Sequence, residues 1–191
     1  TIYLGGGTPS QLAKEDFEAI FSHIYKVYKV TPNAEITLEA NPDDLTSEYI
    51  SMLRTFPFNR ISMGIQTFQE TTLKQLQRRH TADQAIRAFQ GCRTAGFQNI
   101  SIDLMYGLPG ETLTSWKKDL KQALSLHPEH ISAYHLIYEE GTPLWKLREQ
   151  HKVEEADEDL SVSLFGTLID ELTTAGYEHY EISNFCRPGK Y

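Results

Sequence analysis

The sequence alternates between two hydrophobic periods along almost its whole length. Short apolar runs that are typical of β-strands precede segments in which apolar residues recur every three or four positions, as in amphipathic helices. The predicted strands are 2–4, 35–40, 60–66, 100–105, 130–137 and 177–185, and the predicted helices are 14–28, 47–56, 70–77, 82–94, 114–126, 144–150 and one that ends at 174. Six such repeats predict an α/β fold with parallel strands and right-handed helical crossovers.

Polar or glycine positions close nearly every predicted strand, and this pattern favours one α/β architecture over the other. These positions are Gly5 to Gly7, Glu39 with Asn41, Gln66, Asp103, and Tyr134 with His135. An open doubly wound sheet leaves this pattern unexplained, whereas the strand ends of a (β/α) barrel converge on one mouth. The sequence therefore predicts a partial (β/α)6 barrel with outer helices, similar to a TIM barrel, and a shared site at its mouth.

The 191 residues suit a single domain with a sizeable core. We expect residues 1 to about 150 to form the βα units, and about 151–191 to form a helix and a final strand. The chain starts inside a strand without Met and stops soon after a strand-like run. We therefore expect a piece of a larger protein that lacks the first barrel strand and a C-terminal region. The strand 2–4 would then be an exposed edge, so dimerisation through it is a hypothesis.

Composition narrows the classes of partner and the compartment. The chain has 18 basic and 26 acidic residues and a net charge of −8, which argues against a nucleic-acid groove or an anionic membrane surface. No apolar run reaches the roughly 20 residues of a membrane span, and no signal peptide precedes the first strand. Cys92 and Cys186 match neither a disulfide framework nor a metal-ligand spacing. These observations indicate a cytoplasmic protein.

The glycine run and Glu39 each allow two interpretations. Three glycines after a strand bring bare backbone close to a ligand, or they only shape a tight turn. Glu39 lies in a run that should be mostly buried, and a buried carboxylate needs a partner. That partner is either a ligand ammonium or hydroxyl group, or one of the arginines at positions 60, 78 and 79.

The other polar candidates are individually weak. Gln66 can donate and accept hydrogen bonds, yet a glutamine at a strand end is most often an ordinary capping side chain. Asp103 would brace a neighbouring loop if it binds no ligand. The side chains of Arg78 and Arg79 should be exposed to solvent unless one of them turns inward to meet a carboxylate. The run 127–130 (HPEH) has no metal-ligand spacing and is interpreted as structural.

In their order and spacing, four motifs resemble those of a known family. They are 5–10 (GGGTPS), 38–42 (LEANP), 60–68 (RISMGIQTF) with Arg78 after it, and 102–110 (IDLMYGLPG). Together they resemble the oxygen-independent coproporphyrinogen III oxidase family of radical S-adenosylmethionine (SAM) proteins, over almost the whole chain. The ending 180–185 (YEISNF), followed by RPG at 187–189, is more similar to the heme-chaperone branch of this family than to the oxidases.

The resemblance implies SAM as a ligand and assigns roles to the strand ends. In the family the glycine stretch binds the methionyl amino group, the glutamate binds ribose or the amino group, and further residues face the cofactor, a second SAM or substrate. The matching positions here are Gly6, Gly7 and Thr8, then Glu39, then Gln66, Arg78 and Asp103, with Ile137 near the position of another adenosine contact.

The family's iron–sulfur cluster motif is missing from this sequence. A CxxxCxxC loop holds a [4Fe–4S] cluster in the family, and three cysteines leave one iron open to SAM. We therefore expect the cluster in the intact protein, with ligands outside this chain. The chain alone should hold no cluster and perform no radical chemistry, and anaerobic reconstitution should give it no iron–sulfur absorption band.

Two function classes remain open for the intact protein at this point. One is a chaperone that binds heme and passes it on. The other is an oxidase that decarboxylates coproporphyrinogen III to protoporphyrinogen IX; either would need an electron donor. A third interpretation is a phosphate-binding barrel aldolase or isomerase. Such an enzyme requires a catalytic Lys or His at a strand end, where only His135 is available.

Overall fold

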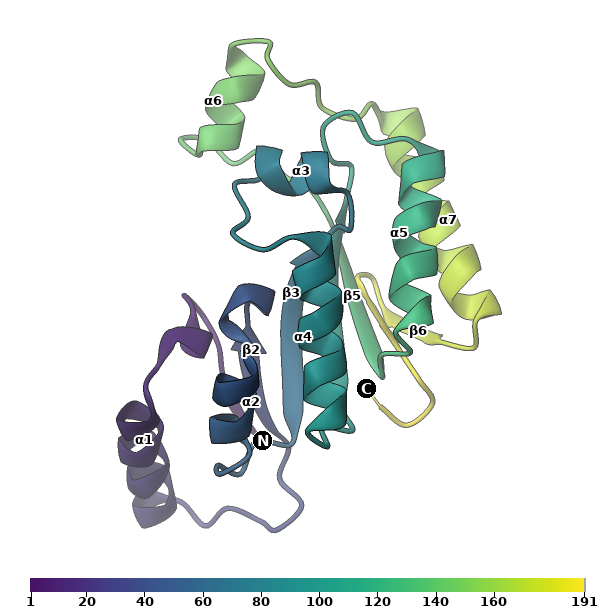
Figure 1. The fold of residues 1–191 in the computed structure, drawn as a ribbon. Coiled ribbons are helices and arrows are strands. Elements are labelled where there is room, and N and C mark those ends of the chain that lie inside the picture. The colour runs from purple at the N-terminus through teal and green to yellow at the C-terminus, as the bar shows by residue number, and fades with distance from the viewer. Residues whose placement is uncertain (191) are drawn as a thin grey trace.

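The structure is a computed structural model that describes residues 1–190. It contains one sheet with helices packed along it (Figure 1). The strands are β1 (Ile2–Leu4), β2 (Ile36–Ala40), β3 (Arg60–Gln66), β4 (Ile100–Tyr106), β5 (His130–His135), β6 (Glu178–Glu181) and β7 (Asn184–Cys186). The α-helices are α1 (Lys14–Val27), α2 (Ser47–Leu53), α3 (Glu70–Gln75), α4 (Ala82–Thr94), α5 (Leu113–Ser125), α6 (Pro143–Glu149) and α7 (Glu158–Thr174).

The sheet has the order β1-β2-β3-β4-β5-β7-β6, and its first five strands are parallel. Leu38 pairs with Leu4 on one side and with Ile61 on the other, and Ile61 pairs with Ile100. Within residues 1–190 the sheet stays open, with β1 and β6 at its edges. The α/β prediction of a partial barrel with parallel strands and outer helices is confirmed for β1 to β5.

The predicted sixth strand, 177–185, is wrong as a single parallel strand. The structure splits it into β6 and β7, an antiparallel hairpin whose second strand pairs antiparallel with β5. The turn is stabilised by Glu181, whose carboxylate accepts hydrogen bonds from Ser183 N (3.1 Å) and Asn184 Nδ2 (2.5 Å). The Ser183 carbonyl in turn accepts from Ala133 N at 2.8 Å. A side chain therefore stabilises a turn that no glycine marks in the sequence.

Local capping signals fix several helix ends where the sequence predicts them. Thr46 caps α2 by accepting from Tyr49 N, and Thr81 forms a capping box with Gln84 at the start of α4. Gly96 follows α4 with φ +96°, a left-handed conformation that glycine adopts without cost. The predicted bounds of α4 are confirmed at both ends.

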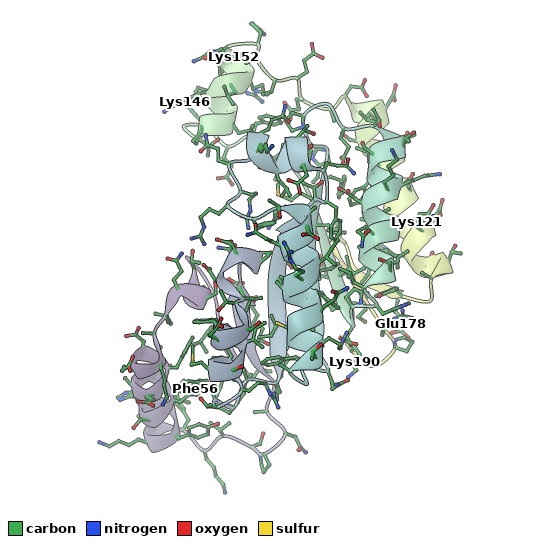
Figure 2. All side chains as sticks on the ribbon, viewed as in Figure 1. Phe56, Lys121, Lys146, Lys152, Glu178 and Lys190 are labelled. Atoms are coloured by element: carbon green, nitrogen blue, oxygen red, sulfur yellow. The ribbon has the colours of Figure 1, made fainter. Side chains whose placement is uncertain are left out.

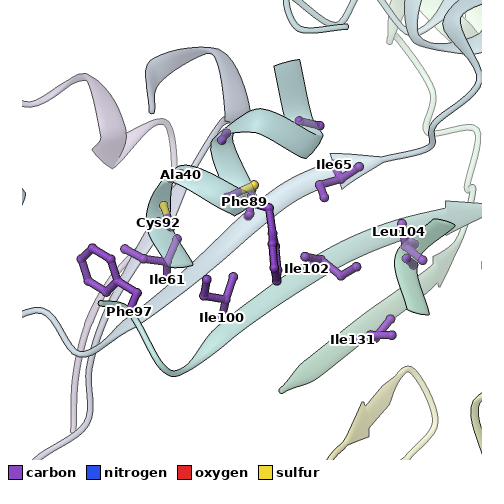
Figure 3. Close-up of a cluster of buried hydrophobic side chains, with 14 of the residues drawn as sticks. Ala40, Ile61, Ile65, Phe89, Cys92, Phe97, Ile100, Ile102, Leu104 and Ile131 are labelled. Atoms are coloured by element: carbon purple, nitrogen blue, oxygen red, sulfur yellow. The ribbon is translucent and has the colours of Figure 1, made fainter. Parts of the chain in front are cut away.

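The helix-packed face of the sheet is apolar and holds the core. Phe89 and Cys92 of α4 lie over Ile61, Ile100 and Ile102 of the strands, and all five are buried (Figure 3). Cys92 is therefore a core residue, not a residue of a helix surface. Farther along the sheet, Trp116 Nε1 of α5 donates to Leu164 O of α7 at 3.1 Å, which joins two helices that lie side by side in Figure 1.

The opposite face of the sheet is polar. Strand register and alternation give it Met105 near the end of β4 and these residues, which we call the polar face: Tyr3, Thr37, Glu39, Arg60, Ser62, Gly64, Ser101, Asp103, His130, Ser132 and Tyr134. A packed barrel interior is filled by branched aliphatic side chains. A polar lining in its place indicates that this face meets a ligand, solvent or another polar surface.

A second, smaller apolar cluster lies at the carboxyl ends of the strands. It contains Leu108, Leu136 and Tyr138, with Leu144 and Trp145 of α6 packed against it. Lys146 of α6 and Lys152 just after it lie at the end of the molecule that α6 forms (Figure 2). Among residues 1–190, no helix combines the length and the apolar character that crossing a membrane requires.

Candidate functional site at the strand ends

A cavity of about 200 Å³ lies at the carboxyl ends of β1 to β4. Its walls come from the glycine turn, the end of β2, the polar face and the segment after α3. The lining residues are Gly7, Thr8, Pro9, Ser10, Glu39, Ala40, Asn41, Ser62, Gly64, Gln66, Arg78 and Asp103. Six of the eight residues that the sequence singles out, far apart along the chain, therefore line one space.

Glu39 is held in place by donors from the first strand and the glycine turn. Tyr3 Oη donates to its Oε1 at 2.6 Å, and Gly6 N donates to its Oε2 at 3.0 Å. Gly6 and Gly7 have backbone φ angles of +76° and +66°, which residues with a Cβ rarely adopt. A Cβ on Gly5 would lie 2.5 Å from Tyr3 Cε1 and 2.8 Å from Glu39 Cδ. The glycines therefore allow the Tyr3–Glu39 pair to form.

Arg78 turns inward, whereas Arg79 stays at the surface. Arg78 Nη2 donates to Asn41 Oδ1 at 2.8 Å and to Gly64 O at 3.1 Å. Its Nε is buried and has no hydrogen-bond partner among the described residues. Arg79 pairs with Asp43 and Asp44 at 3.0 and 3.1 Å. The alternative that Glu39 pairs with an arginine is not realised, because no ion pair of the described residues includes it.

Gln66 ends β3 in a left-handed conformation, with φ +71°. The β3–β4 register shifts between Gly64 and Gln66, so the strand bulges at this point. A non-glycine residue in this region costs about 1 kcal/mol or more and persists only when its surroundings hold it. Asp119 of α5 provides that hold, since it accepts from Phe68 N at 3.3 Å and Gln69 Nε2 at 2.8 Å just after the bulge.

Asp103 is a carboxyl group of the cavity whose pKa is shifted. Burial raises its pKa to about 6, and the nearby charge of Glu39 adds to this rise. The charge of Arg60 and hydrogen bonds with Ser132 and Ser62 oppose it. A cationic ligand in the cavity would stabilise the ionised form of Asp103 and draw its pKa down.

The Asp103 carboxyl is expected to make the free energy of unfolding depend on pH. Because its folded pKa of about 6 lies above the ordinary 3.8, the fold binds this proton more tightly than the unfolded chain does. The resulting stabilisation is complete below about pH 4 and is lost as pH rises through about 6. Asp103→Asn should therefore gain about 2 kcal/mol relative to wild type between about pH 4.5 and about pH 7.5, measured by urea unfolding. A wild-type-to-variant difference that stays constant with pH would contradict this.

Two of the predicted site residues lie outside the cavity lining. Gly6 stands on the outer side of the glycine turn and reaches the site through its bond to Glu39. Ile137 is 72% exposed beyond the end of β5. The strand-end residue His135 is also outside, because its Nε2 bonds Ser161 Oγ of α7 at 2.9 Å. Ile137 stays a prediction from the resemblance, without a contact to the cavity.

Ser10 and Asn41 are cavity residues that the sequence analysis left without a role. Asn41 N donates to Ser10 Oγ at 3.1 Å, and Ser10 Oγ donates to Asp44 Oδ2 at 2.6 Å. Asn41 also orients Arg78. Ser10 lies in the GGGTPS motif and Asn41 lies in the LEANP motif, so these motifs were the available signal.

The HPEH run is structural: Glu129 pairs with Arg93 at 2.9 Å and His130 is buried.

The residues of the cavity suit SAM, which carries an ammonium, a carboxylate and ribose hydroxyls. Glu39 and Asp103 can accept from the ammonium or hydroxyls, and the orphaned Nε of Arg78 is a free donor for a carboxylate. A metal cluster is different. The described residues contain no group of three or more His, Cys, Asp or Glu that could hold a metal ion. Both cysteines are buried free thiols in separate places.

Sequence comparisons place this chain among known proteins. A model of the radical SAM superfamily matches residues 1–123. The chain is 39% identical over 189 residues to the heme chaperone HemW of Lactococcus lactis and 36% identical over 190 residues to HemW of Bacillus subtilis. Each alignment covers 99% of this chain and 50% of the relative. This chain therefore spans about half the length of these relatives.

Comparison of folds gives a consistent result. The coproporphyrinogen III oxidase HemN from Escherichia coli, described as a radical SAM enzyme, superposes with a TM-score of 0.85 at 27% identity. The match covers 98% of this chain and 43% of that one. The resemblance found from the four sequence motifs is confirmed by both comparisons.

Proposed function

Because the chain belongs to the radical SAM superfamily, we propose that the cavity at the strand ends binds SAM. The proposed contacts are Gly6, Gly7, Thr8, Glu39, Gln66, Arg78, Asp103 and Ile137. The observation that carries the proposal is the convergence of a fixed carboxylate, an inward arginine with a free Nε–H and the left-handed Gly7 on one space. These groups complement the charges of an amino acid joined to a nucleoside.

The residues of this chain would bind and orient SAM. Glu39 is fixed by Tyr3 and Gly6, so its carboxylate needs little reorganisation to accept from an ammonium or hydroxyl group. Arg78 would hold the ligand carboxylate through its free Nε–H. Together with the cluster, bound SAM supplies one-electron chemistry in this superfamily. The described residues do not fit the cluster, so its ligands lie outside them in our proposal.

Gly64→Ala is expected to weaken SAM binding with little effect on folding. The added Cβ would lie 2.9 Å from Gln66 Nε2, so this flexible side chain must move from the position that shapes the cavity, while Arg78 Nη2, at 3.5 Å, would stay in ordinary contact. Gly166→Ala in α7 is the matched control, because its Cβ meets nothing within 4 Å. We expect Gly64→Ala to raise the Kd by about tenfold or more, the loss of one charged hydrogen bond. Gly166→Ala should gain up to about 1 kcal/mol of stability with unchanged binding. Calorimetric titration with SAM decides, and equal Kd values for both variants would contradict the role of Gly64.

For the intact protein we propose a heme chaperone as the function. The support is the 39% identity to a protein named heme chaperone HemW over nearly the whole chain. A coproporphyrinogen III oxidase is the second candidate, favoured by the fold match to HemN at 27% identity. Both candidates bind a tetrapyrrole, so they share one class of large ligand. They differ in whether that ligand is carried or changed.

The test uses the intact protein, reconstituted anaerobically with iron and sulfide. Addition of SAM and dithionite should yield 5′-deoxyadenosine if the radical SAM proposal holds. A chaperone should show a Soret band on titration with heme and no decarboxylation of coproporphyrinogen III, and an oxidase should show the reverse. If neither a cluster, SAM cleavage nor a tetrapyrrole complex forms, the proposed function is wrong.

Three further features complete the proposal. A cytoplasmic location agrees with Cys92 and Cys186 as buried free thiols. Either candidate function requires an electron donor for the cluster. Dimerisation remains a proposal that rests on the edge position of β1, and a monomer in light scattering at high concentration would contradict it.

A further inference from the structure

Arg60 is a cation on the polar face for which the described residues offer no bonded partner. It begins β3 and is partly buried, and among residues 1–190 no hydrogen bond or ion pair reaches its guanidinium. Both carboxylates of the same face are occupied elsewhere. Glu39 accepts from Tyr3 and Gly6, and Asp103 is hydrogen-bonded by Ser62 and Ser132. A partly buried charge of this kind is costly unless something completes it.

The position of Arg60 connects it to the cavity. Arg60 lies two residues before Ser62, a wall of the cavity, so it is one pleat period, roughly 6.6 Å, deeper along the same face. Its charge reaches groups on several strands. Burial dominates the pKa of Tyr3, Asp103, His130 and Tyr180, and the positive charge of Arg60 acts on all four in the lowering direction. Arg60 is therefore a central cation of this face.

Exposed aromatic rings lie on the same face of the sheet as this cation. Tyr3 is in register with Thr37, which is in register with Arg60, and Tyr134 follows Ser132 on β5 by one pleat period. Tyr180 reaches the same face, since its Oη is 2.7 Å from His130 Nε2. The exposed fractions of Tyr3, Tyr134 and Tyr180 are 56%, 46% and 46%. Flat apolar surface beside an available guanidinium suits a ligand that has a wide apolar plane and a carboxylate.

We propose that Arg60 binds a carboxylate of a planar ligand that lies on the polar face, next to the strand-end cavity. The planar fork of arginine matches a carboxylate through two parallel hydrogen bonds. This inference rests on the proposed function, which identifies the ligand as a tetrapyrrole and the carboxylate as one of its propionates. Arg60 thereby becomes a specificity residue for the propionate, separate from the SAM contacts.

The test compares two probes on the intact protein. Hemin keeps both propionates, whereas hemin dimethyl ester has both esterified and cannot form the ion pair. Wild type should bind hemin roughly tenfold to a hundredfold more tightly than the diester, as expected for a charged hydrogen-bonded pair. Wild type with equal affinity for both probes overturns the proposal, and this measurement requires no variant.

Substitutions at Arg60 then test whether this residue causes the difference in affinity between hemin and its diester. Arg60→Gln should weaken hemin binding about tenfold and leave the diester unchanged, and Arg60→Lys should retain part of the difference. Arg87→Gln is the matched control, because Arg87 is a surface residue of α4 paired with Asp83, and it should behave as wild type. If Arg60→Gln weakens both probes equally, or only lowers stability, Arg60 is structural and the proposal is wrong. Failure of the proposed function looks different, because wild type would then give no Soret change with either probe.

Discussion

Replacement of Glu39 by glutamine is expected to raise the Kd for SAM by roughly tenfold to a hundredfold. The carboxylate accepts from Tyr3 Oη at 2.6 Å and Gly6 N at 3.0 Å, and its charge is available to a ligand ammonium. An amide has only one acceptor oxygen, so its NH₂ group would face one of these two donors. Hydrogen bonds to charged groups contribute about 1.5–3 kcal/mol, which converts to this range of affinity. Calorimetric titration of the intact protein measures it.

The control for Glu39→Gln is a substitution of Glu35, which precedes the same strand. Glu35 stands just before β2 and outside the cavity lining, so Glu35→Gln removes one negative charge from the same region and should leave the Kd unchanged. Tyr3→Phe removes one of the two donors to Glu39 and should give an intermediate loss. If Glu39→Gln folds and binds SAM as wild type does, the proposed site is wrong. An equal loss in Glu35→Gln would show that only net charge matters.

The cavity was predictable because its residues are signalled locally and their convergence follows from topology. Glu39 and Gln66 lie at the ends of β2 and β3, Asp103 lies inside β4, and parallel strands present their carboxyl ends at one edge. The inward turn of Arg78 was not predictable from its own surroundings. It depends on Asn41 and Gly64, residues 37 and 14 positions away in sequence. Long-range hydrogen bonds of this kind leave no periodic pattern.

The hairpin at the end of the chain shows a second limit of the sequence. Polar and apolar residues alternate in the run 177–185 as in a single strand. The turn of a two-residue hairpin usually contains Asn-Gly or Asp-Gly. Here Ile182 and Ser183 form the turn, and the Glu181 carboxylate supplies the stabilising acceptor. The same hairpin brings Tyr180 to His130 and so helps to build the polar face. The incorrect strand prediction therefore falls where the structure adds an aromatic side chain to the polar face.

Asp119 links the core to the cavity, and its removal should cost more stability than any other change considered. It is fully buried in α5 and accepts from Thr67 Oγ1, Phe68 N and Gln69 Nε2, all in the loop that follows Gln66. Burial raises its pKa above the ordinary value. Asp119→Ala leaves these donors unsatisfied, and each costs about 1–3 kcal/mol. We expect a total loss of about 3–5 kcal/mol, measured by urea unfolding at neutral pH.

Asp119→Asn separates the hydrogen bonds from the charge. The amide oxygen can still accept from Phe68 N and Gln69 Nε2, and Thr67 Oγ1 can reverse its role and accept from the new NH₂ group. The loss should then be only about 1 kcal/mol. Asp83→Ala on the surface of α4 is the control and should stay within about 0.5 kcal/mol of wild type. Because Asp119 holds the loop after the left-handed Gln66, Asp119→Ala should also weaken SAM binding where Asp119→Asn does not. If the two Asp119 variants lose the same stability, the hydrogen bonds are not what holds the β3 bulge, and the strain at Gln66 must be balanced by packing alone.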